Sequence, residues 1–296
     1  MAFRLKTLRE ITTHPLTRHA PLAALRRYGL FHLSQRLFPY PIVYPWIGPL
    51  QLLARKGWAG VVGNLYTGLY DFEDMGFLLH GLRPDDLFVD IGANAGVYSL
   101  LAAGLCQSRV LAIEPLPETF AQLQTQIRLN RLEALIDARQ LGLSNQTGQL
   151  YFSTGLGTMN HVVSKPAAGE AVIEVPVCRL DQLLQTPVRM LKIDTEGFEL
   201  PVLQGADACL SRPELQAIII ELNGSGQHYG YSDQAIDTLL RGYGFAPFRY
   251  LPFERRLEPL EHWRSDQHNT LYLRKSDTLL AELAQAPRLQ VLGQSF

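Results

Sequence analysis

The sequence predicts an α/β protein built on a Rossmann-like, doubly wound, mostly parallel sheet. Short apolar runs of strand length recur along the chain, at residues 87–91, 109–113, 188–193 and 216–222. Segments with helical periodicity follow them, at residues 97–105, 117–131, 199–210 and 232–244. Nearly continuous apolar strands are typical of burial on both faces of a sheet, and crossovers of this length join parallel neighbours.

Local signals support these elements in order. Pro117 stands at the start of the second helix, Ser232 precedes the last one, and Gly244 follows its end; each residue type is favoured at that helix position. Between residues 141 and 181 the pattern weakens. There, LGLSNQTGQLYFSTG places a turn signal between two strand-like runs, and VIEVPVCRLDQLL predicts a strand that leads into a helix.

Both ends of the chain depart from this pattern. Residues 1–65 alternate short helical patches with breaks, and residues 38–50 contain four prolines, which predicts an extended connector there. Residues 276–296 predict a short helix and a loose tail. We therefore expect a basic, partly helical N-terminal extension (1–65), one main domain (66–275) and a C-terminal tail (276–296).

Composition indicates an ordinary globular protein, because 47% of the 296 residues are hydrophobic and 19% are charged. Cys106, Cys178 and Cys209 are widely spaced and form no CxxC pair, which argues against a disulfide framework or a zinc site. No apolar run reaches the length of a membrane-spanning helix, and residues 1–11 lack the features of a secretory signal. We expect a cytoplasmic protein.

Charge is distributed unevenly along the chain. Residues 1–60 contain nine Lys or Arg and one acid, so they carry +8, whereas the remainder carries −9. A basic segment of this kind suggests an anionic partner, namely a membrane surface, a nucleic acid or a phosphorylated substrate. At the inner membrane face, the protein would be peripheral. The alternative is a solvated arm that packs on the acidic body. No aromatic and basic pattern indicates nucleic-acid recognition, so we expect no such partner.

The turn after residues 87–91 has the composition of a ligand site. It has the pattern D-x-G-x-N-x-G, formed by Asp90, Gly92, Asn94 and Gly96. In open α/β sheets, ligands bind beyond the carboxyl ends of the strands, where the first strand turns into its helix. Glycine lets a ligand lie against bare backbone, and asparagine tolerates unusual dihedral angles. We expect these four residues to bind the ligand.

The expected ligand contains no pyrophosphate. The fingerprint G-x-G-x-x-G, counted from Gly92, requires glycine where the chain has Asn94 and Val97. The second strand is followed by Glu114, 24 residues after Asp90, where an acid accepts hydrogen bonds from a ribose diol. A nucleoside with a cationic amino-acid end describes S-adenosylmethionine. The alternative is two unrelated acids at strand ends.

Several motifs resemble those of the FkbM family of class I S-adenosylmethionine-dependent methyltransferases. They are FVDIGANAGVYSLLAA (88–103), IEPLPETF (113–120), LGLSNQTGQLYF (141–152), LKIDTEGFELPVLQGA (191–206), IIIEL (218–222) and NTLYL (269–273). KIDTEGFE is the most specific of them, and together they cover roughly residues 70–275.

This resemblance implies a seven-stranded sheet with a C-terminal β-hairpin, and O-methyl transfer to a hydroxyl of a sugar, glycan or secondary metabolite. It implies that Asp90 and Gly92 hold the methionine end of S-adenosylmethionine and that Glu114 holds the ribose. It also implies that the adenine is contacted by Gly142, Leu143 and Ser144.

Acids at the ends of the next two strands are candidates for catalysis. Asp194 follows the third apolar run, and Glu221 ends the fourth, with Asn223 two residues later. Neighbouring parallel strands bring such ends together. A carboxylate there, or His228 in the following loop, would act as general base. Alternatively, Asp194, Glu221 and Asn223 would bind Mg²⁺ as oxygen ligands.

Other interpretations remain open for several residues. Lys192, within an apolar strand, either takes part in the site or only pairs with an acid. His161 and His268 are weaker base candidates, and residues 155–160 form a small-residue loop that would cover the site. For the whole chain, the alternatives are a non-catalytic or membrane-docked module that binds S-adenosylmethionine and, more remotely, an NAD-dependent oxidoreductase.

Overall fold

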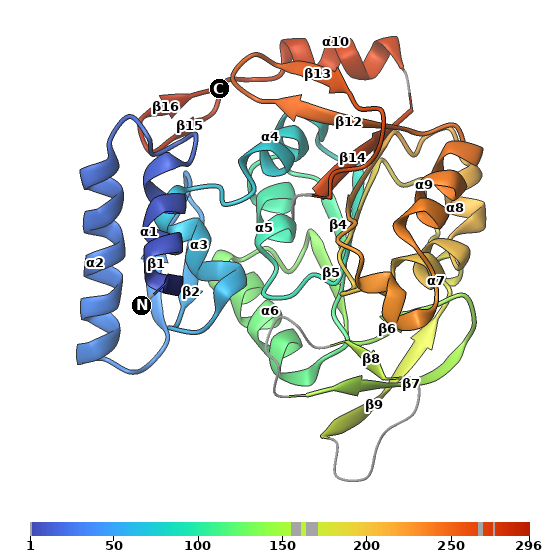
Figure 1. Cartoon of the computed structure of the whole chain (residues 1–296), viewed down its shortest axis with the longest axis horizontal. Helices are drawn as coiled ribbons and strands as arrows, with labels where there is room; N and C mark the ends of the chain where they lie inside the picture. Colours follow the sequence, from blue (N-terminus) through green and yellow to red (C-terminus); the bar gives the residue numbers. More distant parts are fainter. Residues whose placement is uncertain (1, 155–160, 164–170, 266–268, 275) are drawn as a thin grey trace.

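The computed structural model describes residues 2–154, 161–163, 171–265, 269–274 and 276–296. Within this part of the chain, the largest sheet has eight strands in the order β13-β12-β14-β11-β10-β3-β4-β5, and helices cover both of its faces (Figure 1). Its strands are β3 (Leu87–Ile91), β4 (Arg109–Ile113), β5 (Ile136–Arg139), β10 (Met190–Ile193), β11 (Ala217–Glu221), β12 (Ala246–Leu251), β13 (Arg256–Pro259) and β14 (Asn269–Leu273).

The predicted fold class is confirmed. The pairs β10–β11, β10–β3, β3–β4 and β4–β5 are parallel, whereas β14 runs antiparallel to β11. The predicted number of seven strands is wrong by one. Residues 256–259 fold back from β12 as an antiparallel partner and add an eighth strand at the edge of the described sheet.

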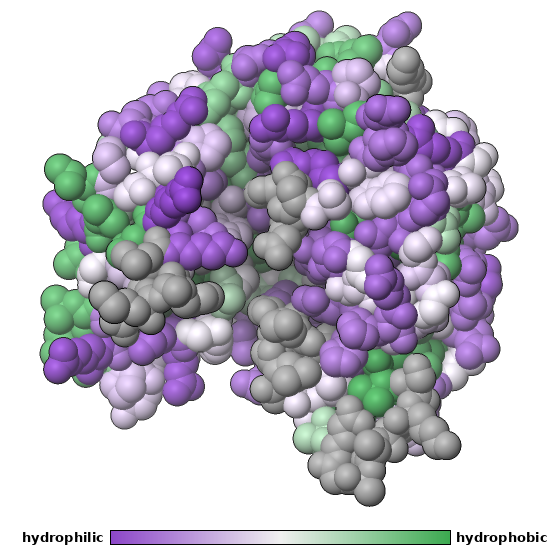
Figure 2. Space-filling model, in the orientation of Figure 1, coloured by the Kyte–Doolittle hydropathy of each residue, from purple (hydrophilic) through white to green (hydrophobic). Residues whose placement is uncertain are grey.

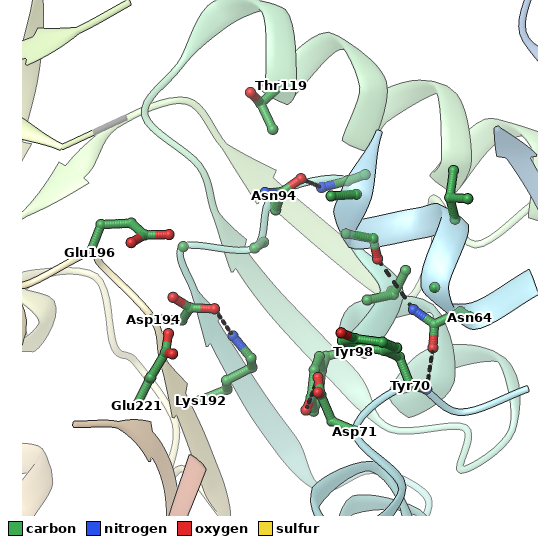
Figure 3. A pocket seen from close by; sticks show the side chains of 18 of the residues that line it. Asn64, Tyr70, Asp71, Asn94, Tyr98, Thr119, Lys192, Asp194, Glu196 and Glu221 are labelled. Atoms are coloured by element: carbon green, nitrogen blue, oxygen red, sulfur yellow. Dashed lines mark hydrogen bonds and ion pairs between the residues drawn. The ribbon is translucent and has the colours of Figure 1, made fainter. Parts of the chain in front are cut away.

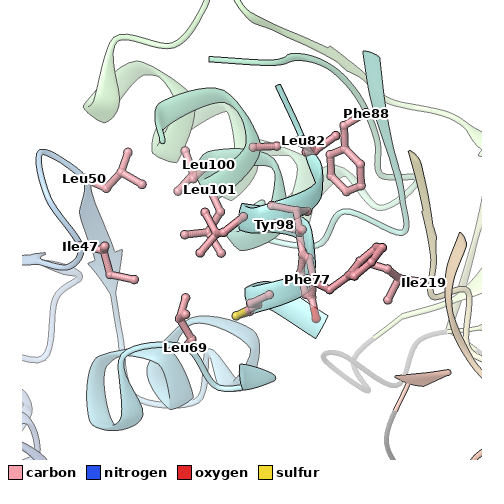
Figure 4. Close-up of a cluster of buried hydrophobic side chains, with 14 of the residues drawn as sticks. Ile47, Leu50, Leu69, Phe77, Leu82, Phe88, Tyr98, Leu100, Leu101 and Ile219 are labelled. Carbon is pink, nitrogen blue, oxygen red and sulfur yellow. The ribbon is translucent and has the colours of Figure 1, made fainter. Parts of the chain in front are cut away.

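Successive side chains of each strand point to opposite faces of the sheet, so a hydrophobic layer lies on each face. In β11, Ile219 packs on one side of the sheet, while Ile218 and Ile220 pack on the other, as expected from the two-residue period of a strand. One layer is covered by α4 (Phe72–Gly81), α5 (Val97–Gly104), α6 (Pro117–Asn130) and α10 (Asp277–Gln285). The other is covered by α7 (Glu199–Gln204), α8 (Asp207–Ser211) and α9 (Asp233–Gly242). Figure 4 shows part of the first layer, around Phe77, Phe88 and Leu100.

The predicted helix over residues 199–210 is divided into α7 and α8. A Cβ atom at Gly205 would overlap the backbone carbonyl oxygen of Ser144. Gly205 therefore lets the strand that contains residue 143 approach the helix closely, and the chain turns there before α8 begins.

A smaller sheet lies beside the carboxyl ends of the main strands. Its order is β6-β9-β7-β8, formed by β6 (Gly142–Leu143), β7 (Gly148–Ser153), β8 (Val162–Val163) and β9 (Val172–Cys178). The 3-10 helix η2 (Leu180–Gln182) follows it, and a second one, η3 (Ser225–Tyr229), follows β11. Phe152, Val162 and Val175 form a separate small apolar cluster under this sheet.

The N-terminal segment packs against α6 and belongs to the first hydrophobic layer. It contains α1 (Ala2–Thr13), α2 (Pro21–Leu37), β1 (Ile42–Pro45), β2 (Gln51–Ala54) and α3 (Ala59–Thr67). The expected extended connector is instead partly a hairpin of β1 and β2. The side-chain amide of Gln126 donates to the Leu53 carbonyl and accepts from the Leu53 N–H. The proposed boundary at residue 65 falls inside α3.

The C-terminal segment is also packed, so the expected loose tail is wrong. Ser276 caps α10 by accepting from the Leu279 N–H at 3.3 Å, and a short hairpin of β15 (Gln290–Val291) and β16 (Gln294–Ser295) follows. The ring of Phe296 is buried against Phe72 and His80. Among the residues described, no helix combines the length and apolar character required to cross a membrane.

Candidate functional site

A cavity of about 930 Å³ lies at the carboxyl ends of β3, β4, β10 and β11. Its wall includes Asp90, Gly92, Asn94 and Glu114 from the first two strand ends, and Asp194 and Glu221 from the next two. Figure 3 shows the side chains of Asp194, Glu196 and Glu221 gathered on one side of this cavity. Parallel pairing therefore brings both groups of predicted acids to one place.

Asp90 is buried at the base of the cavity. Its Oδ2 accepts from the Ser99 N–H at 3.1 Å and from the Ser99 hydroxyl at 2.6 Å. Its Oδ1 is buried and has no hydrogen-bond partner among the described residues. Burial raises the pKa of Asp90, and the positive charge of Lys192 opposes that rise. An orphaned carboxylate oxygen beside a cavity is an acceptor that a bound ligand can satisfy.

The turn around Gly92 is fixed by its neighbours. Gly92 and Asn94 have φ values of 74° and 52°, and the Oδ1 of Asn94 accepts from the Ala95 N–H at 2.7 Å. A Cβ atom at Gly92 would overlap the Asp194 carbonyl oxygen. Gly92 is therefore required by the contact between two strand-end loops, in addition to lining the cavity.

Glu114 holds this turn in place. Its Oε2 accepts from the Asn94 N–H at 2.9 Å and its Oε1 accepts from the Leu116 N–H at 3.0 Å. Burial raises the pKa of Glu114 to about 7, although both backbone hydrogen bonds favour the ionised form. Each carboxylate oxygen has a further lone pair, so Glu114 can still accept a hydrogen bond from a ligand in the cavity.

Other residues expected at the cofactor fall into two groups. Gly142 and Leu143, in β6, line the cavity. Gly96 and Ser144 do not belong to its lining. Gly96 begins α5 with φ of 84°, where a Cβ atom would overlap Leu123, and Ser144 is buried, its N–H donating to the Cys178 carbonyl at 3.0 Å. Both residues have packing roles.

Lys192 forms the centre of the second half of the site. Its Nζ donates to Oδ2 of Asp194 at 2.9 Å and lies 5.0 Å from the centroid of the Tyr98 ring. Burial lowers the pKa of Lys192, but the charges of Asp194 and Asp90 raise it more, so the net pKa lies above the ordinary value. Lys192 is therefore a buried cation that is paired with Asp194 and further stabilised by the charge of Asp90.

Two further carboxyl groups share this region. Burial, together with the charges of Asp194 and Glu221, raises the pKa of Glu196 to about 8. Burial and the charge of Asp194 raise the pKa of Glu221 to about 7. Glu199, by contrast, stabilises the turn before α7, because its Oε1 accepts hydrogen bonds from Thr195 and Gly197 at 3.0–3.1 Å.

Three sequence-predicted residues are not part of the cavity lining. His228 is exposed on η3 and is not among the lining residues. Asn223 is also exposed, and its Oδ1 accepts from the backbone N–H and the hydroxyl of Ser225. His161 lies near Ser153, outside the lining. Residues 155–160 and His268 lie outside the described residues.

The sequence predicted no chemistry in the N-terminal segment, yet that segment forms one wall of the cavity. Tyr28 and His32 from α2, Asn64 from α3, and Tyr70 and Asp71 before α4 all line it. Asp71 accepts from the Tyr98 hydroxyl at 3.0 Å, which ties this wall to the first turn of α5. In the sequence, only Tyr98 indicates this wall, because it is a large ring with a polar hydroxyl that comes directly after the small-residue turn.

The geometry agrees with a comparison of the chain with known families. The model of the "Methyltransferase FkbM domain" matches residues 90–247, which is more than half of the chain. The protein belongs to the FkbM methyltransferase family. It is therefore a methyltransferase enzyme, and S-adenosylmethionine is the methyl donor of its family. The matched range contains both groups of strand-end acids, and the N-terminal wall lies before it.

Individual FkbM relatives share about a quarter to a third of their residues with this chain. "Methyltransferase 1" of Beauveria bassiana is 30% identical over 189 residues, which cover 55% of this chain and 74% of that protein. "Hexuronic acid methyltransferase AglP" of Haloferax volcanii is 27% identical, over 55% of this chain and 64% of that protein. "31-O-demethyl-FK506 methyltransferase FkbM" of Streptomyces tacrolimicus is 28% identical, over 63% and 83%.

A solved FkbM structure is also similar. The crystal structure of "Methyltransferase FkbM" from Methylobacillus flagellatus is 18% identical, with a TM-score of 0.45. The similarity covers 64% of this chain and 43% of that one.

The residues at the first two strand ends fit the cofactor of the FkbM family. The orphaned Oδ1 of Asp90 suits the cationic amino-acid end of S-adenosylmethionine, and the second lone pairs of the Glu114 carboxylate suit a ribose diol. Gly142 and Leu143 present backbone and an apolar side chain to the same cavity.

Proposed function

We propose that this enzyme transfers a methyl group from S-adenosylmethionine to a hydroxyl of a sugar, glycan or secondary metabolite. One observation carries the proposal: Lys192, Asp194, Glu196 and Glu221 line the same cavity as Asp90 and Glu114. The residues proposed to bind the donor and those proposed to handle protons thus face one cavity. A volume of about 930 Å³ lies near the upper end of the range for small-molecule sites and leaves room for an acceptor.

The protein's task is to orient the acceptor and take its proton. S-adenosylmethionine, when bound, supplies a methyl group that is already activated for transfer. A hydroxyl is a poor nucleophile until its proton is removed, and a positioned base does this best when its pKa lies near the working pH. Glu221, with a pKa of about 7, meets that condition.

We assign different roles to the two strand-end acids. Asp194, held by Lys192 at 2.9 Å, is placed to accept a hydrogen bond from the acceptor hydroxyl and to fix its direction. Glu221 takes the proton. His228, which sequence analysis also proposed as a base, has less support because it is exposed and outside the cavity lining.

The proposed Mg²⁺ site of Asp194, Glu221 and Asn223 also has less support. The Oδ1 of Asn223 already accepts two hydrogen bonds from Ser225, and a cation, Lys192, already occupies one oxygen of Asp194. The part of the chain that the structure describes contains no cluster of three or more His, Cys, Asp or Glu side chains arranged for a metal. We expect transfer to continue unchanged in EDTA.

Two features support an acceptor with a ring and several hydroxyls. The N-terminal wall presents the rings of Tyr28, Tyr66 and Tyr70 to the cavity, and aromatic rings stack well on apolar ring faces. In addition, one relative is named for a hexuronic acid and another for 31-O-demethyl-FK506.

Calorimetric titration with S-adenosylhomocysteine tests the donor site, and a methyl-transfer assay with a panel of glycosides tests the acceptor. Asp90→Asn and Glu114→Gln should each weaken S-adenosylhomocysteine binding about tenfold or more. Glu214→Gln, an exposed acid away from the cavity, is the control. Tight binding that neither cavity variant changes would contradict the assigned donor site. Binding without transfer to any hydroxyl would favour a different acceptor class or the non-catalytic alternative.

A further inference from the structure

Helix α2 has one buried face and one exposed apolar face. Ala24, Phe31 and Gln35 are buried against the body of the protein. On the opposite face, the exposed fractions of Leu22, Leu30, Leu33 and Leu37 are 80%, 55%, 53% and 64%. Their spacing of eight, three and four residues places them on one stripe of a helix. Figure 2 shows hydrophobic residues gathered along the left edge of the molecule, over α2.

The charged residues of α2 all have one sign. Arg26 and Arg36 are exposed and follow the same helical spacing as the leucines. Phe38 and Tyr40 extend the exposed apolar surface beyond the end of the helix. Residues 11–70 contain six Lys or Arg and no Asp or Glu. We call Leu22, Arg26, Leu30, Leu33, Arg36 and Leu37, with Phe38 and Tyr40, the α2 outer face.

We propose that the α2 outer face docks this enzyme on an anionic lipid bilayer. Leucines on one side of a helix insert into the boundary between headgroups and acyl chains, and flanking arginines meet lipid phosphates. Aromatic side chains such as Phe38 and Tyr40 favour the same interfacial zone. Monomeric proteins seldom expose contiguous apolar surface without a partner, and here the surrounding charge identifies the partner as anionic.

A second copy of the chain is a less suitable partner for the α2 outer face than a lipid bilayer. A two-fold pair of antiparallel α2 helices, centred between Leu30 and Leu33, would place Arg26 of one copy beside Arg36 of the other. A parallel pair would place each arginine beside its equivalent. Both arrangements bring like charges together, which opposes association.

Docking through this face has a geometric consequence for the cavity. The inward side of α2 contributes Tyr28 and His32 to the cavity wall. Since a helix with its side chains is about 10 Å across, the docked enzyme would hold this wall about one helix diameter from the lipid surface.

Co-sedimentation of the full chain with vesicles tests the proposal. The vesicles contain phosphatidylcholine with about one third phosphatidylglycerol, and pure phosphatidylcholine vesicles are the comparison. We expect binding to the anionic vesicles that weakens as salt is raised. Leu33→Glu should reduce the partition coefficient about tenfold, and Leu30→Glu combined with Leu33→Glu should abolish sedimentation. Leu280→Glu is the matched control, because Leu280 on α10 has a nearly equal exposed fraction of 50%.

Several results would overturn the proposal. Wild-type protein that stays in the supernatant would do so, as would equal losses from Leu33→Glu and Leu280→Glu. A wild-type dimer that Leu33→Glu converts to a monomer, without vesicle binding, would show that the face pairs copies of the chain. Thermal unfolding checks that the variants remain folded. Arg26→Gln with Arg36→Gln supplies an independent test, since it should lower anionic binding at low salt while leaving the apolar stripe intact.

Discussion

Gly92 and Asp194 lie so close that a Cβ atom at Gly92 would overlap the backbone carbonyl oxygen of Asp194. Gly92 belongs to the turn at the proposed donor site, and Asp194 belongs to the loop at the proposed acceptor site. The N–H of Asp194 also donates to the Ile91 carbonyl at 3.0 Å. The two halves of the site are therefore in direct backbone contact.

This contact predicts a large effect of Gly92→Ala. The added carbon has no space, and the positive φ of 74° adds strain for any residue with a side chain. We expect the free energy of unfolding to fall by about 3 kcal/mol, measured by urea denaturation, with weaker S-adenosylhomocysteine binding. Gly148→Ala is the control, because its Cβ atom would meet no atom within 4 Å. Equal effects of both substitutions would contradict the steric argument.

Replacement of Lys192 by Met should destabilise the protein. The substitution keeps most of the apolar stem but leaves the carboxylates of Asp90 and Asp194 without their buried cation. Breaking a buried pair in this way removes about 3 kcal/mol of stability, which urea denaturation would measure. The exposed Lys56, at the cavity wall, provides the control Lys56→Met. A fully stable Lys192→Met protein would mean that the neighbouring carboxyl groups are already protonated.

The assignment of Glu221 as base predicts the pH dependence of methyl transfer. A base must be ionised to take a proton, so activity should rise as the pH rises through about 7, the pKa of Glu221. Glu221→Gln should lower the turnover number about a hundredfold or more without weakening S-adenosylhomocysteine binding, and Glu214→Gln should have no effect. If the Glu221→Gln variant kept the same pH profile, another group would have to be the base.

Asp74 should make the folding stability depend on pH. Burial raises the pKa of Asp74 to about 8 from its ordinary value of 3.8, so between these values the unfolded chain releases a proton that the folded protein retains. Stability contributed by this group therefore falls as the pH rises, by about 1.4 kcal/mol per pH unit. Asp74→Asn, which preserves the acceptor for Asn269, should be more stable than wild type at pH 8 but not at pH 4. Parallel stability curves would exclude a protonated Asp74.

The central sheet was predictable because its strands are encoded locally. Each apolar run, such as 87–91, is nearly continuous and is followed by polar or small residues, which specifies both a buried strand and its end. The edge strand β13 was missed because residues 256–259 carry two charged side chains and a proline in place of an apolar run, as is typical of an exposed edge. Gly205, where the helix is divided, lies against Ser144, 61 residues earlier, and no local sequence pattern predicts that contact.

The candidate site was predictable where it follows from strand order. Asp90, Glu114, Asp194 and Glu221 each lie at or just after the end of a buried strand, and neighbouring parallel strands meet at one edge. Their roles stay proposals. The N-terminal wall was not predictable, because residues such as Tyr28 reach the cavity only through tertiary packing, and their spacing in the sequence is that of any surface helix.

The N-terminal wall has a consequence for acidity. Burial is the largest cause of the raised pKa values of Glu114, Glu196 and Glu221, and burial here means separation from bulk water by whatever encloses the cavity. Helices α1 to α3 form part of that enclosure. A segment that looks like an appendage in the sequence therefore helps to determine the local dielectric constant, and with it the pH range over which the acids of the site exchange protons.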